Sequence, residues 1–481
     1  MGGTTAVRAT FTIAGRFFNE MLSFVVFTFL DLCDVFLCFF YKIMDYTMES
    51  EWKPCYCSSS AKDVITSRRC STNILLSEYG KTKILRLSST KLHLDEISDT
   101  LYQRPSLVSE MSKSTVKELR RIKFSSSSSS GATATSRSTT TFTINSTIVE
   151  MLQEKIGRKH SQPLPRWSDC NCHTCTCWNS SPRKESSLFV HTEGRQDRAE
   201  EDVLFIHGFL SSSLFWTETI FPNMSESTKS KYRLFAVDLL GFGRSPKPMD
   251  SLYTLKEHVD MIEGSVLQAY NVKSFHIVAH SLGSILALAL AVKFPDSVKS
   301  LTLIAPPYFP VPEGEKMTQY VLRKVAPRRI WPPLVFGASV ACWYEHISRT
   351  ACLVICKNHQ LWEYLVKQIV RNRIRTFLMD GFFCHTHNSV WHTFHNIICG
   401  SAGKMNGYLD TVRDEMKCDV TIFHGDYDDL LPVKCSQDVG SRIPRARVRI
   451  VEKKDHITIV VGNVVFAREL EEIWSRTKSM S

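Results

Sequence analysis

Short apolar runs alternate with amphipathic segments along the C-terminal part of the chain. The runs lie at 203–208, 233–243, 275–280, 298–307, 419–425 and 447–456. Most of them show no alternation of polar and apolar residues, which is typical of strands buried on both faces of a parallel sheet. Strands that alternate with helices favour a doubly wound α/β domain. We therefore expect an α/β fold with a mostly parallel sheet over residues 191–481, closed by a helix at about 464–474.

One of the intervening segments carries a clear helix start. In TLKEHVDMIEGSVLQAYN, Thr254 and Glu257 have the spacing of a capping box, in which each residue bonds the backbone amide of the other. We expect an amphipathic helix from this point.

The strand rhythm stops between Ala305 and Lys417, where bulky and basic residues dominate. An insertion between two late strands predicts a helical cap at about 306–417, over the sheet edge where α/β sites lie. We expect several cap aromatics to line an apolar channel, with nearby arginines around its mouth. The alternative is that the aromatics form the core of the cap and the arginines point into water. The residues concerned are Trp331, Phe336, Trp343, Trp362, Phe377, Phe382, Phe383, Arg328, Arg329 and Arg373.

The N-terminal segment, residues 1–49, is strongly hydrophobic. Met21 to Tyr41 is long enough to cross a bilayer, but Asp31 and Asp34 interrupt it. A signal peptide, an uncleaved anchor and a segment lying on the membrane all remain open. No clear cleavage site follows, and we expect entry into the secretory pathway, with the chain anchored at the plasma membrane or secreted to the cell wall. Nearby cysteines either accept an acyl chain or are ordinary thiols: Cys33, Cys38, Cys55 and Cys57.

Residues 50–190 differ from the rest in composition. The run FSSSSSSGATATSRSTTTFT has too few apolar residues to offset the entropy of ordering it, which predicts a partly disordered stalk. Near its end, DCNCHTCTCW holds a dense group of thiols, Cys170, Cys172, Cys175 and Cys177. We expect local disulfides here; zinc is the minor alternative, because a second distant ligand pair is missing.

The overall charge indicates which classes of partner the chain can bind. The formal net charge is +11, yet the basic residues form no stripe with a recognisable nucleic-acid reader motif. We expect no nucleic-acid partner, and attraction to an anionic membrane surface instead. The sequence leaves the oligomeric state open.

The strongest chemical signal lies where the 275–280 run meets the next helix. There Ala279-His280-Ser281-Leu282-Gly283 has the form of a nucleophile elbow, G-x-S-x-G, with alanine in place of the first glycine. The plain alternative is a strand-to-helix turn in which Ser281 is an N-cap. Acyl transfer through serine also needs a base, an orienting carboxylate and fixed donors for the oxyanion.

Later strand ends supply the acid and the base. Asp428 lies in HGDYDDLLP, three residues after Gly425, with Asp426 and Asp429 as competitors and a solvated surface turn as the alternative. His456 is the only histidine C-terminal to Asp428, so the order Ser, Asp, His of the α/β-hydrolase arrangement selects it.

The first strong strand supplies the oxyanion donors. The backbone amides of Phe209 and Leu282 form the predicted oxyanion hole, and His207 is expected to support this loop. No metal or cofactor is indicated for this site.

From about Val203 to Trp474 the chain resembles the α/β-hydrolase superfamily in VLFIHGFLSSSLFW, FAVDLLGFGRSPKP, IVAHSLGS, IFHGDYDDLLP and KKDH. The combination is most similar to the plant BODYGUARD family, described as probable lysophospholipases needed for cuticle formation. The resemblance implies a serine hydrolase of lipidic acyl esters at the plant epidermal surface. It also implies that Ser281, Asp428 and His456 form the triad.

Other functions share this fold. An acyltransferase or cutin-polyester synthase would use the same triad, and a non-catalytic receptor or scaffold could retain it. Epoxide hydrolases use an aspartate nucleophile, which Ser281 disfavours. Labelling with a fluorophosphonate probe separates a live nucleophile from a scaffold.

Overall fold

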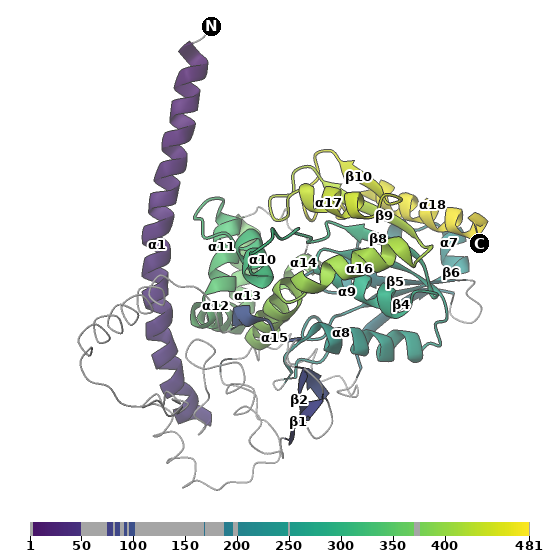
Figure 1. Cartoon of the computed structure of the whole chain (residues 1–481), viewed down its shortest axis with the longest axis horizontal. Coiled ribbons are helices and arrows are strands. Elements are labelled where there is room, and N and C mark those ends of the chain that lie inside the picture. The colour runs from purple at the N-terminus through teal and green to yellow at the C-terminus, as the bar shows by residue number, and fades with distance from the viewer. Residues whose placement is uncertain are drawn as a thin grey trace, which may run out of the picture.

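A seven-stranded sheet lies at the centre of the molecule, in the order β10-β9-β8-β7-β5-β6-β4 (Figure 1). The computed structural model describes residues 3–49, 75–79, 82–86, 91–93, 96–101, 168, 187–195, 201–248, 251–369 and 376–480. Neighbouring strands pair in parallel, except that β4 pairs antiparallel with β6. The expected α/β fold with a mostly parallel sheet is confirmed.

The strands are β4 (Val190–Gly194), β5 (Glu201–Ile206), β6 (Tyr232–Val237), β7 (Phe275–His280), β8 (Val298–Ile304), β9 (Asp419–Gly425) and β10 (Arg447–Val451). The helices beside the sheet are α6 (Leu214–Thr217), η3 (Phe221–Asn223), α7 (Glu226–Lys231), α8 (Leu255–Ile262), η4 (Glu263–Gln268), α9 (Leu282–Lys293), α16 (Ala402–Asp414), α17 (Lys434–Arg442) and α18 (Val464–Met480). A separate small antiparallel sheet contains β1 (Leu75–Tyr79), β2 (Thr82–Arg86) and β3 (Lys91–His93).

The continuous apolar runs are strands because both faces of the sheet are covered. In β5, Leu204 and Ile206 belong to the core beneath α8, α9 and α16, whereas Val203 and Phe205 belong to the core beneath α18. Successive side chains of a strand point to opposite faces, so a strand between two helical layers needs apolar residues throughout. The helix α9 is apolar all round for the same reason: α8 and α16 cover the side that the sheet does not.

The predicted capping box is present at the start of α8. Thr254 accepts a hydrogen bond from the Glu257 amide, and the Glu257 carboxylate accepts one from the Thr254 amide. This pair fixes the first turn of a helix that packs against α9.

The first strand of the sheet lies before the first apolar run in the sequence. The edge strand β4, with the sequence VHTEG, has every residue half-buried. An edge strand has one neighbour and one well-covered face, so its sequence lacks the apolar signal that marked the inner strands. This strand was not predicted.

Helices occupy the stretch between β8 and β9 (Figure 1). They are α10 (Met317–Val325), α11 (Pro333–Trp343), α12 (Glu345–Lys357), α13 (His359–Ile369), α14 (Thr376–Phe383), α15 (His387–Thr393) and η5 (Phe394–Cys399). The last helix of the stretch, α16, packs against α9 and therefore covers the sheet.

The cap aromatics do not behave as one group. Trp343 and Phe383 are buried, whereas Trp331 and Phe382 are exposed. The position of Arg328 at a channel mouth stays a prediction, and the structure shows which groups this residue contacts. Its guanidinium stacks on the ring of Trp343 at 4.3 Å and forms an ion pair with Asp31 of the N-terminal helix. Arg329 is exposed, and Arg373 lies outside the described residues.

The N-terminal segment forms one long helix, α1 (Gly3–Glu49), whose second half lies beside α11 and α12 (Figure 1). Residues 18–48 include an 18-residue window with a mean hydropathy of 2.1 and are long enough to cross a membrane. One face of this half contacts the cap, through residues spaced three or four apart: Ser23, Phe27, Asp31, Asp34, Cys38, Tyr41 and Asp45. We call this set the docking stripe.

The aspartates that interrupt the apolar segment are the polar part of this contact. Asp34 accepts hydrogen bonds from the backbone amides of His346 and Ile347. Asp45 accepts two hydrogen bonds from the guanidinium of Arg349, at 2.6 and 2.9 Å. Because the partners of Asp34 and Asp45 belong to the cap, these two carboxylates hold α1 against the cap.

Parts of the predicted stalk also contact the cap. The Ser98 amide donates to the Asn396 side chain, and Arg349 donates to the hydroxyl of Ser168. The cysteine group at 170–177, Cys55 and Cys57 lie outside the described residues. Of the other candidate acylation sites, Cys38 is buried in the docking stripe and Cys33 is half-buried.

Candidate active site

Ser281 occupies the turn between β7 and α9 in a backbone conformation that side chains rarely adopt, with φ 51° and ψ −122°. Such a conformation costs about 1–3 kcal/mol and persists only where the surroundings enforce it. Here the Ser281 amide donates to the Ile304 carbonyl at 2.8 Å, and the Ser284 amide donates to the Ser281 carbonyl at 2.8 Å. The Ser281 hydroxyl makes no capping bond to α9. The geometry therefore favours the elbow over the simple N-cap.

The two small residues of the elbow meet different surroundings. A Cβ atom at Gly283 would lie 2.7 Å from the carbonyl oxygens of Ile206 and His207, so this position requires glycine. Ala279 is the last but one residue of β7, pairs with Ile206 and Leu303, and is completely buried. Its methyl group is accommodated within the sheet, which explains how the chain departs from the usual first glycine.

The loop after β5 lies against the elbow. A Cβ atom at Gly208 would approach Nδ1 of His280 to 2.8 Å and Cβ of Ser281 to 3.2 Å. Only glycine, which has no Cβ atom, fits at this distance. The chain therefore passes close to Ser281 before it reaches Phe209. The ring of Phe209 packs on Phe242 and Phe394. Leu282, the other predicted donor, is the first residue of α9, where backbone amides have no partner within the helix.

His207 is buried and joins two loops. Its Nε2 accepts a hydrogen bond from the Leu239 amide at 2.9 Å, so its Nδ1 carries the hydrogen and donates to the Gly208 carbonyl at 2.7 Å. Burial lowers the pKa of His207, although Asp238 opposes this. A ring with both nitrogens engaged supports the loop and is not available to take a proton.

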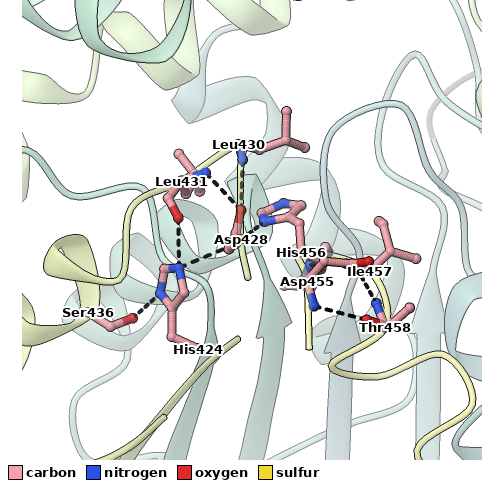
Figure 2. A network of polar contacts seen from close by, with 10 residues as sticks. His424, Asp428, Leu430, Leu431, Ser436, Asp455, His456, Ile457 and Thr458 are labelled. Atoms are coloured by element: carbon pink, nitrogen blue, oxygen red, sulfur yellow. Dashed lines mark hydrogen bonds and ion pairs between the residues drawn. The ribbon is translucent and has the colours of Figure 1, made fainter. Parts of the chain in front are cut away.

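Asp428 and His456 meet at the ends of β9 and β10, as Figure 2 shows. Nδ1 of His456 donates to Oδ2 of Asp428 at 2.7 Å. The other carboxylate oxygen, Oδ1, accepts from the amides of Leu430 and Leu431 at 2.9 and 2.8 Å. Because Nδ1 carries the hydrogen, Nε2 of His456 retains the lone pair that a general base needs.

A second histidine supports the acid from its far side (Figure 2). Nε2 of His424 lies 2.9 Å from the Leu431 carbonyl and 3.3 Å from Oδ2 of Asp428, and its Nδ1 lies 2.7 Å from the Ser436 hydroxyl. Burial by itself raises the pKa of Asp428, but the hydrogen bonds from His424 and His456 outweigh it and hold this pKa well below its usual range. The carboxylate is therefore ionised at neutral pH.

The competing aspartates have other roles. Asp426 is exposed and accepts from the Lys454 amide, and Asp429 is exposed. Asp455 accepts from the amides of Ile457 and Thr458 and so shapes the turn that follows His456 (Figure 2). Asp428 alone of the three candidates after β9 touches His456 in the described structure.

His280 connects this network to the elbow. Its Nε2 donates to the backbone carbonyl of His456 at 2.9 Å, and the two imidazole rings are 4.7 Å apart. Burial, and then the neighbouring His456, lower the pKa of His280 to about 3. This neutral residue directly precedes Ser281, so its bond holds the His456 loop beside the serine.

Asp238 organises the loops behind the oxyanion region. It accepts from the amides of Ser213 and Arg244, at 2.5 and 2.7 Å, and a Cβ atom at Gly243 would collide with its carboxylate. Asp238, His280 and His424 were not predicted as site residues from the sequence. Their signals were present in the motifs FAVDLLGFG, AHS and IFHGD, but a supporting residue is recognised only from its contacts.

The arrangement contains the parts that acyl transfer through serine requires. A serine stands on a strained turn, a histidine with a free lone pair is oriented by a buried carboxylate, and two backbone segments approach the serine. Among the described residues, the side-chain groups able to hold a metal ion lie in the cap and include none of these residues.

The chain is similar to known proteins over its whole length. Residues 203–462 match the model of the alpha/beta hydrolase fold. "Probable lysophospholipase BODYGUARD 3" of Arabidopsis thaliana is 55% identical, over 97% of this chain and 98% of the relative. "Probable lysophospholipase BODYGUARD 1" of the same plant is 54% identical, over 96% and 97%. Among solved structures, MenH from S. aureus aligns with a TM-score of 0.44 and 18% identity, over 60% of this chain and 98% of that one. The chain belongs to the α/β-hydrolase fold family and, within it, to the BODYGUARD group of ester hydrolases.

Proposed function

We propose that this protein is a serine hydrolase of lipidic acyl esters, with lysophospholipids as the substrate class. Ser281 is the nucleophile, His456 the general base and Asp428 the residue that orients it. The observation that carries the proposal is the bond from His456 Nδ1 to a buried carboxylate, made beside a serine held at φ 51°. Two relatives named as probable lysophospholipases, each more than half identical, support the substrate class.

The first half of the reaction transfers the acyl group to the enzyme. Ser281 Oγ attacks the ester carbonyl while His456 Nε2 takes the hydroxyl proton, and Asp428 stabilises the imidazolium that forms. The amides of Phe209 and Leu282 donate to the oxyanion of the tetrahedral intermediate. When this intermediate collapses, His456 gives the proton to the leaving alcohol. For a lysophospholipid this alcohol is the glycerol hydroxyl that carried the acyl chain.

The second half releases the acyl group. Water attacks the acyl-serine carbonyl while it gives a proton to His456. When this intermediate collapses, His456 returns the proton to Ser281 Oγ, which releases the free fatty acid and regenerates the enzyme. If an alcohol takes the place of water, the same steps give acyl transfer. Hydrolysis and transfer therefore share the triad and differ in the acceptor alone.

We also propose that α1 holds the enzyme at a lipid surface. The side of α1 away from the docking stripe exposes large apolar residues, including Phe24, Phe36 and Phe39. A position across the bilayer would carry the docked partners Arg328 and Arg349 into hydrocarbon, at a high energetic cost. If α1 lies in the membrane interface, these arginines stay in contact with the protein, and the exposed apolar side of α1 contacts lipid. Location at the epidermal surface, and a role in cuticle formation, belong to the same proposal and rest on the family resemblance.

The nucleophile is tested by covalent labelling. The full chain, purified in detergent, is treated with a fluorophosphonate probe and compared with Ser281→Ala and with Ser441→Ala, an exposed serine on α17. We expect labelling of wild type and Ser441→Ala and none of Ser281→Ala. Equal labelling of all three would place the reactive serine elsewhere, and no labelling of folded wild type would favour a non-catalytic scaffold.

The substrate class is tested with the same samples. Lysophosphatidylcholine and ω-hydroxy acyl esters are supplied in mixed micelles, with water or an added alcohol as acceptor, and the products are separated by mass spectrometry. We expect free fatty acid from lysophospholipid, lost in Ser281→Ala. Acyl transfer to the alcohol in preference to water would assign the acyltransferase function to this triad.

A further inference from the structure

The cap contains two thiols and an imidazole gathered at one point, outside the site described above. Cys352 and Cys356 lie one turn apart on α12, and His385 lies in the connection between α14 and α15. The two Sγ atoms are 3.6 Å apart, and Cys352 Sγ is 3.6 Å from Nε2 of His385. All three residues are buried, and their donor atoms lie within 4.8 Å of one another. We call them the cap cysteine–histidine cluster.

These separations are those of ligands around one tetrahedral ion. Bonds of about 2.3 Å from zinc to sulfur and about 2.0–2.1 Å to nitrogen, at tetrahedral angles, put two sulfurs about 3.8 Å apart and a sulfur and a nitrogen about 3.6 Å apart. The two separations given above lie within about 0.2 Å of these values. The third pair of donors, Cys356 Sγ and His385 Nε2, lies within 4.8 Å, so an adjustment of this pair of side chains would bring the three donors to one ion.

The histidine is held in the tautomer that binds metals. Its Nδ1 donates to the Phe382 carbonyl at 2.6 Å, so the lone pair is on Nε2, the nitrogen nearest the thiols. A carbonyl behind a ligating imidazole is the usual second contact of a metal-bound histidine. The thiols are presented together because residues four apart share one face of a helix.

We propose that the cap cysteine–histidine cluster binds a zinc ion through two thiolates and one imidazole, and that this ion ties α12 to the segment before α15. Binding displaces the two thiol protons to solvent and forms two zinc–sulfur bonds and one zinc–nitrogen bond, with no change in oxidation state. These donors favour zinc among abundant divalent ions, since thiolate ligands are soft.

The ion would sit where the cap meets the catalytic loops. His385 forms an isolated antiparallel bridge with Phe242, and the Gly243 amide donates to the Cys384 carbonyl at 3.1 Å. The ring of Phe242 packs on Phe209, whose amide is a proposed oxyanion donor. Zinc at the cluster would therefore fix the cap segment that backs this loop, a structural role distinct from the serine chemistry.

Metal content tests the proposal directly. The full chain is purified in detergent without chelator, and zinc is measured by inductively coupled plasma mass spectrometry. We expect about one zinc per chain, falling about tenfold or more in Cys356→Ser and in His385→Ala. Cys342→Ser and Cys435→Ser, which change buried free cysteines elsewhere, are the matched controls and should keep the metal.

Cobalt substitution identifies the ligands. Co²⁺ bound to thiolates gives a sulfur-to-metal charge-transfer band in the near ultraviolet, with intense visible bands if the site is tetrahedral. A second group of potential donors, His359, Glu363 and Asp380, has no sulfur and cannot give this band. We expect the band in wild type and in a variant with serine at Cys170, Cys172, Cys175 and Cys177, and its loss in Cys356→Ser and His385→Ala.

Several outcomes would overturn the proposal. Folded wild type that shows no charge-transfer band with excess Co²⁺ has no such site. A band that survives in Cys356→Ser but disappears in the variant of residues 170–177 assigns the metal to those cysteines. A Cys352–Cys356 disulfide, found by peptide mapping of protein purified without reductant, would also exclude it.

Discussion

His456 is bound to Asp428 by a 2.7 Å hydrogen bond, and the Asp428 side chain is completely buried. A buried carboxylate that accepts from an imidazole can orient the ring and stabilise its charged form, but only while both partners are correctly placed. The two residues are 28 positions apart and follow different strands. Their meeting depends on the parallel pairing of β9 and β10, which brings both strand ends to one edge of the sheet.

Asp428→Asn should lower kcat by about four orders of magnitude, because an amide in this place favours the wrong imidazole tautomer. Asp426→Asn and Asp429→Asn alter exposed carboxylates and should cost far less. The measurement is steady-state hydrolysis of a short soluble ester by the purified variants. Similar losses in all three variants would mean that the loop has a structural role and that the acid lies elsewhere.

Acid should weaken the fold through Asp428. Burial raises the pKa of this carboxyl, but the bonds from His424 and His456 lower it below the ordinary 3.8. A group with a depressed folded pKa contributes its full stability above the unfolded pKa and loses it as the pH falls through the folded one. The difference in unfolding free energy between wild type and Asp428→Asn should therefore be large near neutral pH and shrink below about pH 4.

Chemical denaturation of both proteins across this pH range measures the difference, with Asp429→Asn as the exposed control. A difference as large in acid as at neutral pH would show that the bonds to His424 and His456 do not depend on the charge of the carboxylate.

Gly208→Ala should impair catalysis without preventing folding. The added methyl would lie 2.8 Å from His280 Nδ1 and 3.2 Å from Ser281 Cβ, so the loop carrying the Phe209 amide must move. Losing one oxyanion donor typically costs about 10²–10³ in kcat. Gly407→Ala on α16 is the matched control, because its Cβ meets nothing within 4 Å. If Gly208→Ala retained wild-type kcat, the Phe209 amide would not be an oxyanion donor.

Asp45→Asn should loosen the docking of α1. It removes the charge opposite Arg349, which is buried and donates two hydrogen bonds to this carboxylate. Breaking a buried ion pair at one partner typically costs about 3–5 kcal/mol. We expect a lower thermal midpoint in detergent and faster proteolytic removal of α1, whereas Glu20→Gln, at an exposed position of the same helix, should behave as wild type.

A second arm of this test concerns the mature protein. If α1 is a permanent part of the fold, N-terminal mass spectrometry of protein from plant tissue should recover peptides from residues 18–48. Protein that consistently begins after Glu49 would show that the docked helix is a cleaved signal.

The inner strands and the fold class could be predicted because each depends on a local pattern. Runs such as VLFIHG are apolar enough to indicate strands buried on both faces. The order of Ser281, Asp428 and His456 along the chain limits which residues can form the triad. The edge strand β4 was not predicted, because a strand with one neighbour and one covered face needs few apolar residues.

The remaining relationships join residues far apart in the chain. Nothing near Asp31 or Asp34 shows that their partners lie in the cap, so within an apolar helix both appeared as interruptions. Arg328 was placed at a channel mouth because its neighbours are aromatic, yet the same neighbours carry it towards α1. The role of His424 follows from its distance to Asp428, which no spacing rule predicts.

The docking stripe also sets an order of events during synthesis. Asp45 precedes Arg349 by 304 residues, so α1 leaves the ribosome long before the helix that receives it has been translated. Until then the apolar helix must be sheltered by another surface, which the membrane of the proposed secretory route would supply. Completion of the cap would then draw the helix sideways onto the protein, which makes this docking a late step of maturation.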